Sequence, residues 1–481
     1  MSSPSATSAG RESWLDRIQR NHDRRTQFSS KYENATEARL QGESELLRDL
    51  WLKLSSWRYE QSAASELSDE ALRAEVDRAL QAIEYRTRLA EIAVTPEQFQ
   101  SLVLDWVVGY GYVDTLRREV GEIQDLHVSG RTGAAYYHAG TKPGYTDLAP
   151  INDPKMLKWF VDRVTQGATP AVSVLDPLPP TNHLKERPGV RVSVADESAA
   201  GGYAVSIRFF PQTPMRLEDL VRRQMLTNRM AQWLREIYLA GASILIIGAT
   251  SAGKSTVAYS LSEEVMDDRL IIVGNPLEIQ HSNRYCETME VREAGAEGGR
   301  DVDVAAYIRK ALTMAPDRLV LTEARGGEML PLLNGLSTGH GGSLTTIHAD
   351  GIRQALNVRV PLMISQAEEG KNMSPWAVSS LLALAFDLAV YVEAKYVDGI
   401  RVRKVDEIAL LFDADRDSNQ VSTKTIFKLE HKGSYACSGI SEFPSGLLSK
   451  ADKKGLDFDG LRLTPFTDGL DEEAYEWNPT L

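Results

Sequence analysis

The spacing of apolar residues changes along the chain and divides it into segments. Residues 11 to about 95 contain no proline, and within 66–94 the apolar side chains recur at close to helical spacing. That pattern predicts helix. We therefore expect residues 1–95 to form a disordered leader followed by a helical extension. A plain helical appendage and a dedicated partner-docking arm both fit this pattern.

From Pro96 the pattern shortens to β-type runs at 123–130, 189–196 and 202–210, separated by turns and by one helical stretch at 154–166. Such a mixture predicts a small α/β domain over residues 96–210. Two prolines within "PQTP" then indicate a linker over 211–217.

A βαβ order begins in the next segment. An amphipathic helix is expected over 216–241, ending at Gly241, and is followed by the strand "SILIIG", a glycine loop, the helix "KSTVAYSLSEEV" and the strand "RLIIVG". This order predicts a parallel sheet. We assign residues 218–425 to this larger domain and residues 426–481 to a C-terminal cap with an acidic tail.

Length, charge and cysteine spacing limit the classes of function that fit the chain. A chain of 481 residues is long for one core, and a net charge of −13 disfavours DNA as the main substrate because the surface repels a phosphate backbone. The run 381–392 is short and contains Asp387, so it predicts core and not a membrane span. The two cysteines, Cys286 and Cys437, show no CxxC spacing, which fits a reducing cytosol.

A phosphate-binding loop is the strongest motif. "GATSAGKST" satisfies GxxxxGK[ST] between an apolar strand and a helix, where backbone N–H groups and the helix N-terminus surround phosphate oxygens. Lys254 is expected to neutralise the β- and γ-phosphates, and Ser255 to place its hydroxyl on Mg²⁺. The candidate nucleotide-binding residues are Gly248, Thr250, Ser251, Ala252, Gly253, Lys254, Ser255 and Thr256.

Two further polar residues follow apolar strands. Leu319 to Leu321 lead to Glu323, and the apolar residues of "SLTTI" lead to His348. Both are expected at the carboxyl edge of the sheet, where ligands of parallel sheets gather. There Glu323 could orient an attacking water, and His348 could report the γ-phosphate. Gly341 and Gly342, just before this strand, are interpreted as giving the loop room to move.

These segments resemble the secretion ATPases of the type II/type IV secretion and type IV pilus superfamily, with the greatest likeness to the tight-adherence (Flp-type) pilus branch. The likeness covers about residues 104–465. It is carried by "GYGYVDTLRREVGEIQDLHVSG", "GVRVSV", "VSIRFF", "ALTMAPDRLVLTEARGGE", "LSTGHGGSLTTIHAD", "LAVYVEAKYVDGIRVRKVDEIALL" and "TIFKLEHKG".

The resemblance implies a RecA-like P-loop NTPase domain behind a smaller, PAS-like α/β domain, with ATP and Mg²⁺ bound where the two meet. It also implies roles for single residues. Glu323 orients water, His348 is the histidine of the family's histidine motif, and Arg325 organises the site. Arg191 and Arg208 of the smaller domain reach the phosphates. Glu278 helps to hold Mg²⁺ or water.

Three departures from the family pattern stand out. Gly274 and Asn275 replace two carboxylates of the acidic motif, Thr313 and Ala315 replace arginines, and Thr322 replaces glycine. Fewer local carboxylates weaken metal or water positioning, so we predict a low turnover in the isolated protein.

The function implied is an ATP-hydrolysing motor subunit for pilus assembly or protein secretion. The resemblance implies that it works as a homo-oligomeric, hexameric ring in the cytoplasm, held at the inner membrane through a platform protein. Two alternatives stay open: a conjugation or DNA-transfer motor, and a weakly hydrolysing nucleotide-gated scaffold suggested by the depleted acidic motif.

Overall fold

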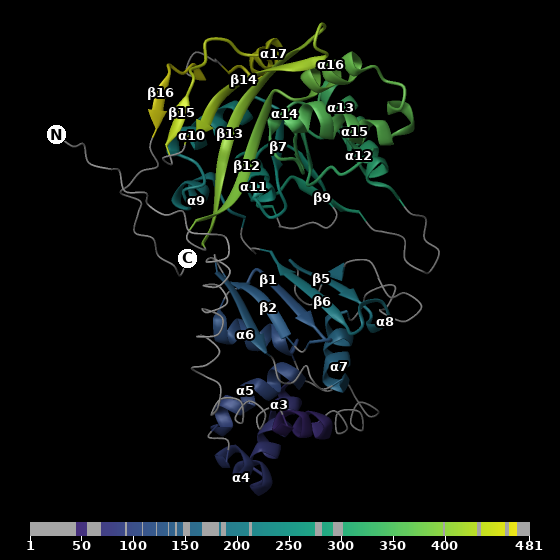
Figure 1. Ribbon diagram of the computed structural model, residues 1–481, viewed down its shortest axis with the longest axis vertical. Helices are drawn as coiled ribbons and strands as arrows, with labels where there is room; N and C mark the ends of the chain where they lie inside the picture. The colour runs from purple at the N-terminus through teal and green to yellow at the C-terminus, as the bar shows by residue number, and fades with distance from the viewer. Residues whose placement is uncertain are drawn as a thin grey trace, which may run out of the picture.

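The computed structural model places a small body below a larger one (Figure 1). The residues it describes are 45–54, 69–91, 94–107, 109–121, 123–132, 134–139, 142–147, 154–165, 182–183, 189–210, 214–274, 281–291, 302–397, 400–430, 434–456 and 461–468. Glu278, most of the acidic motif and the acidic tail beyond Asp468 lie outside these residues, as do residues 1–44 of the expected leader and extension.

The small body combines helices with a six-stranded sheet of order β3-β2-β1-β6-β5-β4, whose described pairings are antiparallel. Its strands are β1 (Asp125–Ser129), β2 (Ala134–Ala139), β3 (Lys142–Asp147), β4 (Asn182–His183), β5 (Val190–Ala195) and β6 (Ala204–Phe209). Its helices are α3 (Asp69–Leu80), α4 (Ile83–Glu91), α5 (Pro96–Val107), α6 (Tyr112–Val120), α7 (Pro154–Val164) and α8 (Glu197–Ala200).

The strands expected near 123–130, 189–196 and 202–210 and the helix near 154–166 are all present as β1, β5, β6 and α7. Helical spacing in 66–94 is also confirmed, as α3 and α4. One continuous apolar core joins the helical N-terminal part to the sheet, since it runs from Leu46 to Phe209. The helical part is therefore packed on the small sheet and not a separate body.

The larger body is built on a ten-stranded sheet of order β16-β15-β14-β13-β12-β7-β11-β10-β8-β9. Its strands are β7 (Ile244–Gly248), β8 (Leu270–Gly274), β9 (Cys286–Glu290), β10 (Arg318–Leu321), β11 (Leu344–Ile347), β12 (Leu388–Val397), β13 (Ile400–Asp415), β14 (Gln420–Leu429), β15 (Tyr435–Cys437) and β16 (Phe466–Asp468). Strands β12 to β9 in this order are parallel, and β13 to β16 continue the sheet as antiparallel neighbours.

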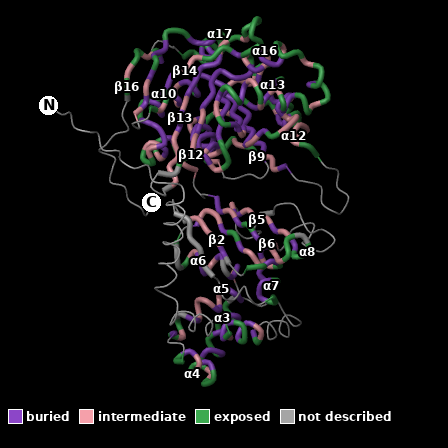
Figure 2. The backbone as a smooth tube through the Cα atoms, in the orientation of Figure 1, coloured by how far each residue is buried: buried purple, intermediate pink, exposed green. Residues whose placement is uncertain are grey.

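The central strands form where the sequence has continuous apolar runs. Every residue of β7, β8, β10 and β11 is buried, as expected for parallel strands covered on both faces. Figure 2 shows this buried centre as the purple interior of the larger body. The strand order expected for a βαβ unit is thus confirmed as a parallel sheet.

Helices cover both faces of this sheet. One face carries α9 (Leu217–Arg222), α10 (Asn228–Leu239), α11 (Lys254–Ser262) and α17 (Ser445–Lys453) in one apolar cluster. The other face carries α12 (Val304–Leu312), α13 (Met329–Ser337), α15 (Val360–Gln366) and α16 (Pro375–Ala385), with α14 (Ile352–Gln354) joined to α15 by a π-helix over Ala355–Arg359.

The single helix expected over 216–241 is wrong, because the structure has α9 and α10 instead. Gln224 adopts a φ of 55° between them, which an α-helix does not allow. Thr227 then starts α10 by accepting a hydrogen bond from the backbone N–H of Met230. The amphipathic pattern runs through both helices, so periodicity alone hides the break.

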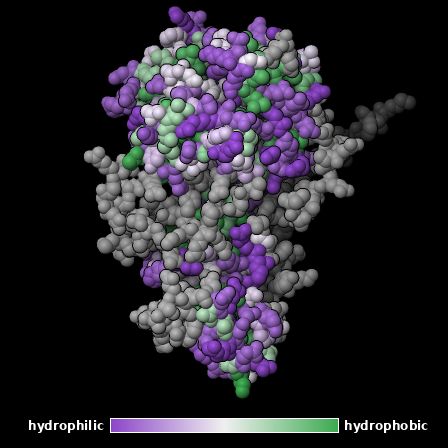
Figure 3. Space-filling view, turned by 180° about the vertical axis from the view of Figure 1, so that it is seen from behind, coloured by the Kyte–Doolittle hydropathy of each residue, from purple (hydrophilic) through white to green (hydrophobic). Residues whose placement is uncertain are grey.

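The C-terminal segment completes the large sheet. The expected boundary between residues 425 and 426 falls inside β14, and β15, β16 and α17 belong to the same body. The run 381–392 spans the end of α16 and the start of β12, and its Asp387 is buried. No helix among the described residues has the length and apolarity needed to cross a membrane. On the face shown in Figure 3, hydrophobic residues of the larger body lie in small groups among hydrophilic ones.

Candidate functional site

The glycine loop turns the chain from strand β7 into helix α11. Two residues of the loop adopt left-handed conformations, Ser251 at a φ of 57° and Gly253 at 105°. Gly248 is required by space, because a Cβ atom there would lie 2.3 Å from the carbonyl oxygen of Val392 in β12. No side chain caps the N-terminus of α11. Its first N–H groups therefore face the loop, which is the arrangement that binds phosphate oxygens.

Lys254 lies across the mouth of this loop. It is the first residue of α11 and its side chain is largely buried. Its Nζ donates a hydrogen bond to the carbonyl oxygen of Ala249 at 3.0 Å and lies 3.2 Å from Nδ1 of His348. Lys254, at the end of the glycine loop, is thus in direct contact with His348, 94 residues away in sequence.

Glu323 and His348 meet because their strands are neighbours. β10 and β11 pair in parallel, and each residue follows the carboxyl end of its strand. Oε1 of Glu323 lies 2.8 Å from Nε2 of His348. Its Oε2 accepts a hydrogen bond from Nη2 of Arg325 at 3.1 Å. Lys254, His348, Glu323 and Arg325 therefore form one continuous polar line at the sheet edge.

The charges around this line favour a neutral histidine and an ionised glutamate. Burial and the neighbouring Lys254 ammonium lower the pKa of His348, although Glu323 pulls in the opposite direction. Burial would raise the pKa of Glu323, but Arg325, His348 and Lys254 outweigh it, so that the pKa lies below its usual value. Because the Lys254 ammonium only donates, Nδ1 of His348 is the acceptor, and the ring proton is on Nε2, facing Glu323.

The small body contributes Arg208 to the loop. Nε of Arg208 donates to Oδ1 of Asp125 at 2.7 Å, and Nη2 reaches Oγ of Ser251 at 3.4 Å. Arg191 is the direct cross-strand partner of Arg208 between β5 and β6. Directly opposite residues share a face of the sheet, so both arginines belong to the face from which Arg208 reaches the loop.

Two arginines that sequence reasoning missed also contact the loop. Arg401 and Arg403 lie on β13, far along the chain. Nη2 of Arg401 donates to the carbonyl oxygen of Thr250 at 3.3 Å, and Nε of Arg403 to that of Ser251 at 3.1 Å. In the sequence "RVRK", basic residues alternate with an apolar one, and this pattern is typical of a solvated strand face. The alternation does put both arginines on one face, but it gives no hint of the loop opposite.

Gly341 and Gly342 are explained by packing. Gly342 has a φ of 80°, and a Cβ atom there would lie 2.4 Å from a guanidinium nitrogen of Arg318. Arg318 is buried in β10 and donates to the carbonyl oxygen of Tyr238 at the end of α10. A Cβ atom at Gly341 would lie 3.1 Å from Cδ of Lys450. The structure thus gives these glycines a role in close packing, where the sequence had suggested loop movement.

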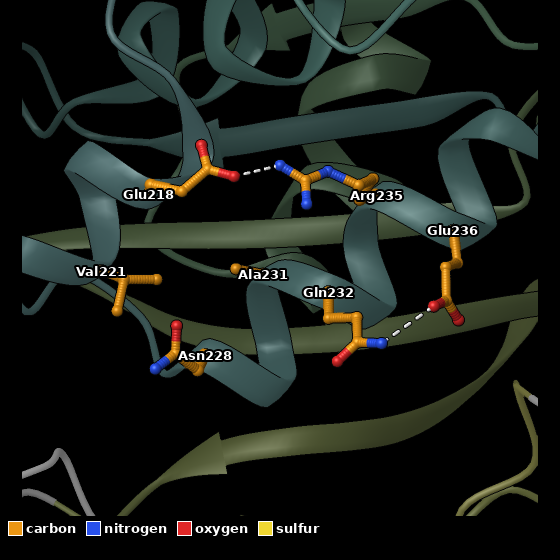
Figure 4. A pocket seen from close by; sticks show the side chains of 7 residues that line it. All are labelled: Glu218, Val221, Asn228, Ala231, Gln232, Arg235 and Glu236. Atoms are coloured by element: carbon orange, nitrogen blue, oxygen red, sulfur yellow. Dashed lines mark hydrogen bonds and ion pairs between the residues drawn. The ribbon is translucent and has the colours of Figure 1, made fainter.

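A hollow between α9 and α10 lies apart from this site. Figure 4 shows its lining, with Arg235 pointing toward Glu218. Arg235 is also paired with Glu264, at 2.6 Å. Two carboxylates therefore neutralise the charge of Arg235, and Glu236 adds a further negative charge to the lining. Such a hollow disfavours phosphate groups, so the glycine loop remains the candidate site.

Comparison with known proteins points to one family for the central part of the chain. Residues 184–384 match the family model described as "Type II/IV secretion system protein". VirB11 of the type IV secretion system of Brucella suis is 27% identical over 289 residues, which cover 56% of this chain and 78% of that protein. The conjugal transfer protein TrbB of Rhizobium radiobacter is 30% identical over 211 residues, covering 43% and 61%.

A conjugal transfer protein of Mycobacterium tuberculosis is 29% identical over 218 residues, and the chain spans only 60% of its length. Among solved structures, the pilus retraction motor PilT with bound ADP shares 17% identity at a TM-score of 0.46, over 64% of this chain and 84% of that chain. The family model and the relatives described above do not single out the tight-adherence branch.

Proposed function

We propose, from the match of residues 184–384 to the type II/IV secretion system protein family, that the protein is an ATPase that powers secretion or pilus assembly. The observation that carries the proposal is the contact of Lys254 with His348 and of His348 with Glu323 beside the glycine loop. In this proposal, a phosphate-binding loop, a cation, a neutral imidazole and an ionised carboxylate share one site.

Each group has a chemical role in this proposal. The N–H groups of the loop and of the α11 N-terminus bind the phosphates, and Lys254 neutralises their charge. The carboxylate of Glu323 accepts a hydrogen bond from the attacking water and takes its proton as the bond to the γ-phosphorus forms. ADP leaves as the bridging P–O bond breaks. His348 holds Glu323 through Nε2–H and registers the phosphate through its contact with Lys254.

Magnesium fits the donor set of the site. Ser255 is the second residue of α11 and supplies a hydroxyl, as the sequence expects. Among the described residues, no three His, Cys, Asp or Glu side chains gather as metal ligands. Mg²⁺ commonly keeps several waters and takes phosphate oxygens in place of a protein cage. We propose that Ser255 binds it together with ATP, with Glu278 as an outer partner.

The proposed motion links the two bodies. Arg208 joins Asp125 of the small sheet to Ser251 of the loop, and with Arg191 it would stabilise charge on the transferring phosphoryl group. We propose that the small body is a PAS-like domain with its helical extension, and that the larger body, including its C-terminal strands, is a RecA-like domain joined to it by the linker over 211–217. We also propose a hexameric ring that docks in the cytoplasm on an inner-membrane platform protein.

A DNA-transfer motor is the second candidate, favoured by the conjugal transfer proteins among the relatives. The net charge of −13 argues against it. Salt-dependent DNA binding with stimulation of ATP hydrolysis would favour this candidate, and no stimulation would remove it.

The test is the rate of ATP hydrolysis measured against protein concentration, for the natural sequence and for Glu323→Gln. A ring motor should show a cooperative rise in specific activity, lost in the variant while ATP binding persists. A nucleotide-gated scaffold would instead keep assembly and biological output in Glu323→Gln. Fast hydrolysis by isolated monomers would contradict the ring and the expectation of low turnover.

A further inference from the structure

One stretch of strand β13 holds four backbone carbonyl groups of two separate loops. Arg401 and Arg403 donate to the carbonyl oxygens of Thr250 and Ser251 in the glycine loop. The next two residues hold the turn between α9 and α10. Nζ of Lys404 donates to the carbonyl oxygen of Gln224 at 2.5 Å, and the backbone N–H of Val405 to that of Met225 at 2.8 Å.

The two side-chain contacts at Ser251 and Gln224 have a common feature. Four described residues other than glycine have a positive φ, and Ser251 (57°) and Gln224 (55°) are two of them. Such conformations are strained and persist only where the surroundings enforce them. Arg403 and Lys404 each bind the carbonyl oxygen of the strained residue itself. β13 therefore stabilises both turns at the point where the backbone is least favourable.

The direction of these contacts matters for phosphate binding. A loop that turns its N–H groups inward must turn some of its carbonyl groups outward, where donors from outside the loop can hold them. Arg401 and Arg403 supply the donors from outside the loop. The stem of Arg403 also packs on Gly253, where a Cβ atom would lie 3.5 Å from its Cδ.

Ser251 is also the residue that the small body reaches. Arg208 contacts its hydroxyl, whereas Arg403 holds its carbonyl. The β12–β13 hairpin runs from the large sheet toward the small one (Figure 1). Its arginines are near enough to His138 of β2 to add to the effect of burial in lowering the pKa of that histidine. The hairpin and the small body thus approach the loop from neighbouring positions.

We propose that Arg403, supported by Arg401, is a positioning residue that holds the glycine loop in its phosphate-binding conformation from outside. This inference rests on the proposed function. Arg403 acts through Ser251 and takes no part in the reaction of water with the γ-phosphate. Without it, the loop populates its binding-competent conformation less often, and the apparent affinity for nucleotide falls by that fraction.

The experiment measures ADP binding with Mg²⁺ by calorimetry and the steady-state hydrolysis of ATP, on the full chain. Arg403→Met keeps the apolar stem and removes the donors, whereas Arg403→Lys keeps a positive donor. Arg416→Met is the matched control, because Arg416 stacks on Trp376 at the β13–β14 turn and not on the glycine loop. Thermal melting of each variant shows whether it is folded.

Arg403→Met should weaken ADP binding and raise KM for ATP about tenfold, as expected for the loss of a charged hydrogen bond, with kcat within about twofold. Arg403→Lys should recover most of the affinity, and Arg416→Met should match the natural sequence. Arg401→Met should show a smaller loss in the same direction, and it decides the matter if Arg403→Met does not fold.

The outcomes separate the two proposals. If the natural sequence binds neither ADP nor ATP, the proposed function falls and this inference with it. If it binds ADP but folded Arg403→Met binds equally well, the function stands and the positioning role is overturned. A fall in kcat with unchanged KM would also overturn it, since the arginine would then act on the reaction itself.

Discussion

Nε2 of His348 lies 2.8 Å from Oε1 of Glu323, and Nδ1 of the same ring lies 3.2 Å from Nζ of Lys254. The histidine therefore joins the carboxylate proposed to orient water to the lysine proposed to bind phosphate. Nδ1 accepts a hydrogen bond from Lys254, so the ring proton is on Nε2, where it can be donated to Glu323. A change in the position of Lys254 would therefore alter the hydrogen bond between His348 and Glu323.

His348→Ala should keep ATP binding and slow hydrolysis. Lys254 and the loop N–H groups remain to bind phosphate, but Glu323 loses the donor that orients it. Because general acid–base groups contribute about 10²- to 10⁴-fold and His348 acts here through Glu323, we expect a loss of about 10- to 100-fold in kcat. Single-turnover hydrolysis and equilibrium binding of ATP separate the two effects.

His340→Ala is the control for this variant. His340 lies in the loop before β11 and contacts the carbonyl oxygen of Pro316, away from the polar line. It should hydrolyse ATP at the natural rate. Loss of nucleotide binding or of the fold in His348→Ala would show that the histidine has a structural role only.

Glu323→Gln should abolish most hydrolysis while ATP still binds. The amide has nearly the same shape, but it has no negative charge with which to accept the proton of water. A fall of about 10²- to 10⁴-fold in kcat is expected for the loss of a general base. Glu287→Gln, an exposed change in β9, serves as the control. Equal rates in Glu323→Gln and the natural sequence would assign the catalytic carboxylate elsewhere.

The sequence predicted the central features of this site because they depend on local patterns. Apolar runs followed by Glu323 and His348 place both residues at the carboxyl edge of a parallel sheet, and the glycine motif predicts the loop beside them. No comparable local pattern points to Arg401 and Arg403. Their contacts depend on the long β12–β13 hairpin returning beside the loop, and the register of strands distant in sequence is not written in a local pattern.

The break between α9 and α10 also depends on contacts that a local sequence pattern does not predict. Gln224 is an ordinary helix-forming residue. Its φ of 55° is stabilised by β13, where Lys404 binds the carbonyl oxygen of Gln224 and Val405 binds that of Met225. Likewise, the sequence suggests that Gly342 is a flexible position, whereas the structure shows that the buried Arg318 leaves no space for a side chain there. At both positions, contacts with residues distant in sequence override the local conformational preference.

Hydrolysis should stay constant as the pH falls through 6.5 and decline only below it. Burial and Lys254 lower the pKa of His348. Burial raises the pKa of Glu323, but Arg325, His348 and Lys254 together outweigh it, so both side chains keep their active forms at pH values below their usual pKa. For His348, the unfolded chain binds more protons between the lowered pKa and 6.5, so stability rises with pH across that window. A kcat profile from pH 5 to 8 tests this, since a decline centred above 6.5 would contradict it.

Gly342→Ala should destabilise the larger body. The added methyl group would meet the Arg318 guanidinium at 2.4 Å, and a φ of 80° is unfavourable for alanine. Gly339→Ala isolates the backbone effect, since Gly339 has a φ of 133° with no atom within 4 Å of the added Cβ. We expect about 1–2 kcal/mol for the control and roughly 2 kcal/mol more for Gly342→Ala, measured by denaturant unfolding. Equal losses would show that Arg318 moves aside freely.

The pairing of Asp387 with Lys450 predicts how the C-terminal helix is held. Asp387, just before β12, is buried and accepts hydrogen bonds from Nζ of Lys450 at 2.6 Å and from the backbone N–H of Ser243 at 2.7 Å. Lys450→Met removes one partner and leaves a buried carboxylate. That change should cost about 3 kcal/mol in the free energy of unfolding. Lys453→Met, an exposed change on the same helix α17, should cost much less.

The pH dependence of this loss has a definite sign. Burial raises the pKa of Asp387, and Lys450 opposes that rise. In Lys450→Met the opposition is gone, so the folded chain takes up a proton at a higher pH than the unfolded chain. Stability is then present at low pH and lost as the pH rises, and the cost of Lys450→Met should be smaller at pH 5 than at pH 8. Adding Asp387→Asn should recover part of the loss at pH 8, because no unpaired charge remains buried. A cost that is the same at both pH values would mean that Lys450 contributes through packing against Gly341 and not through its charge.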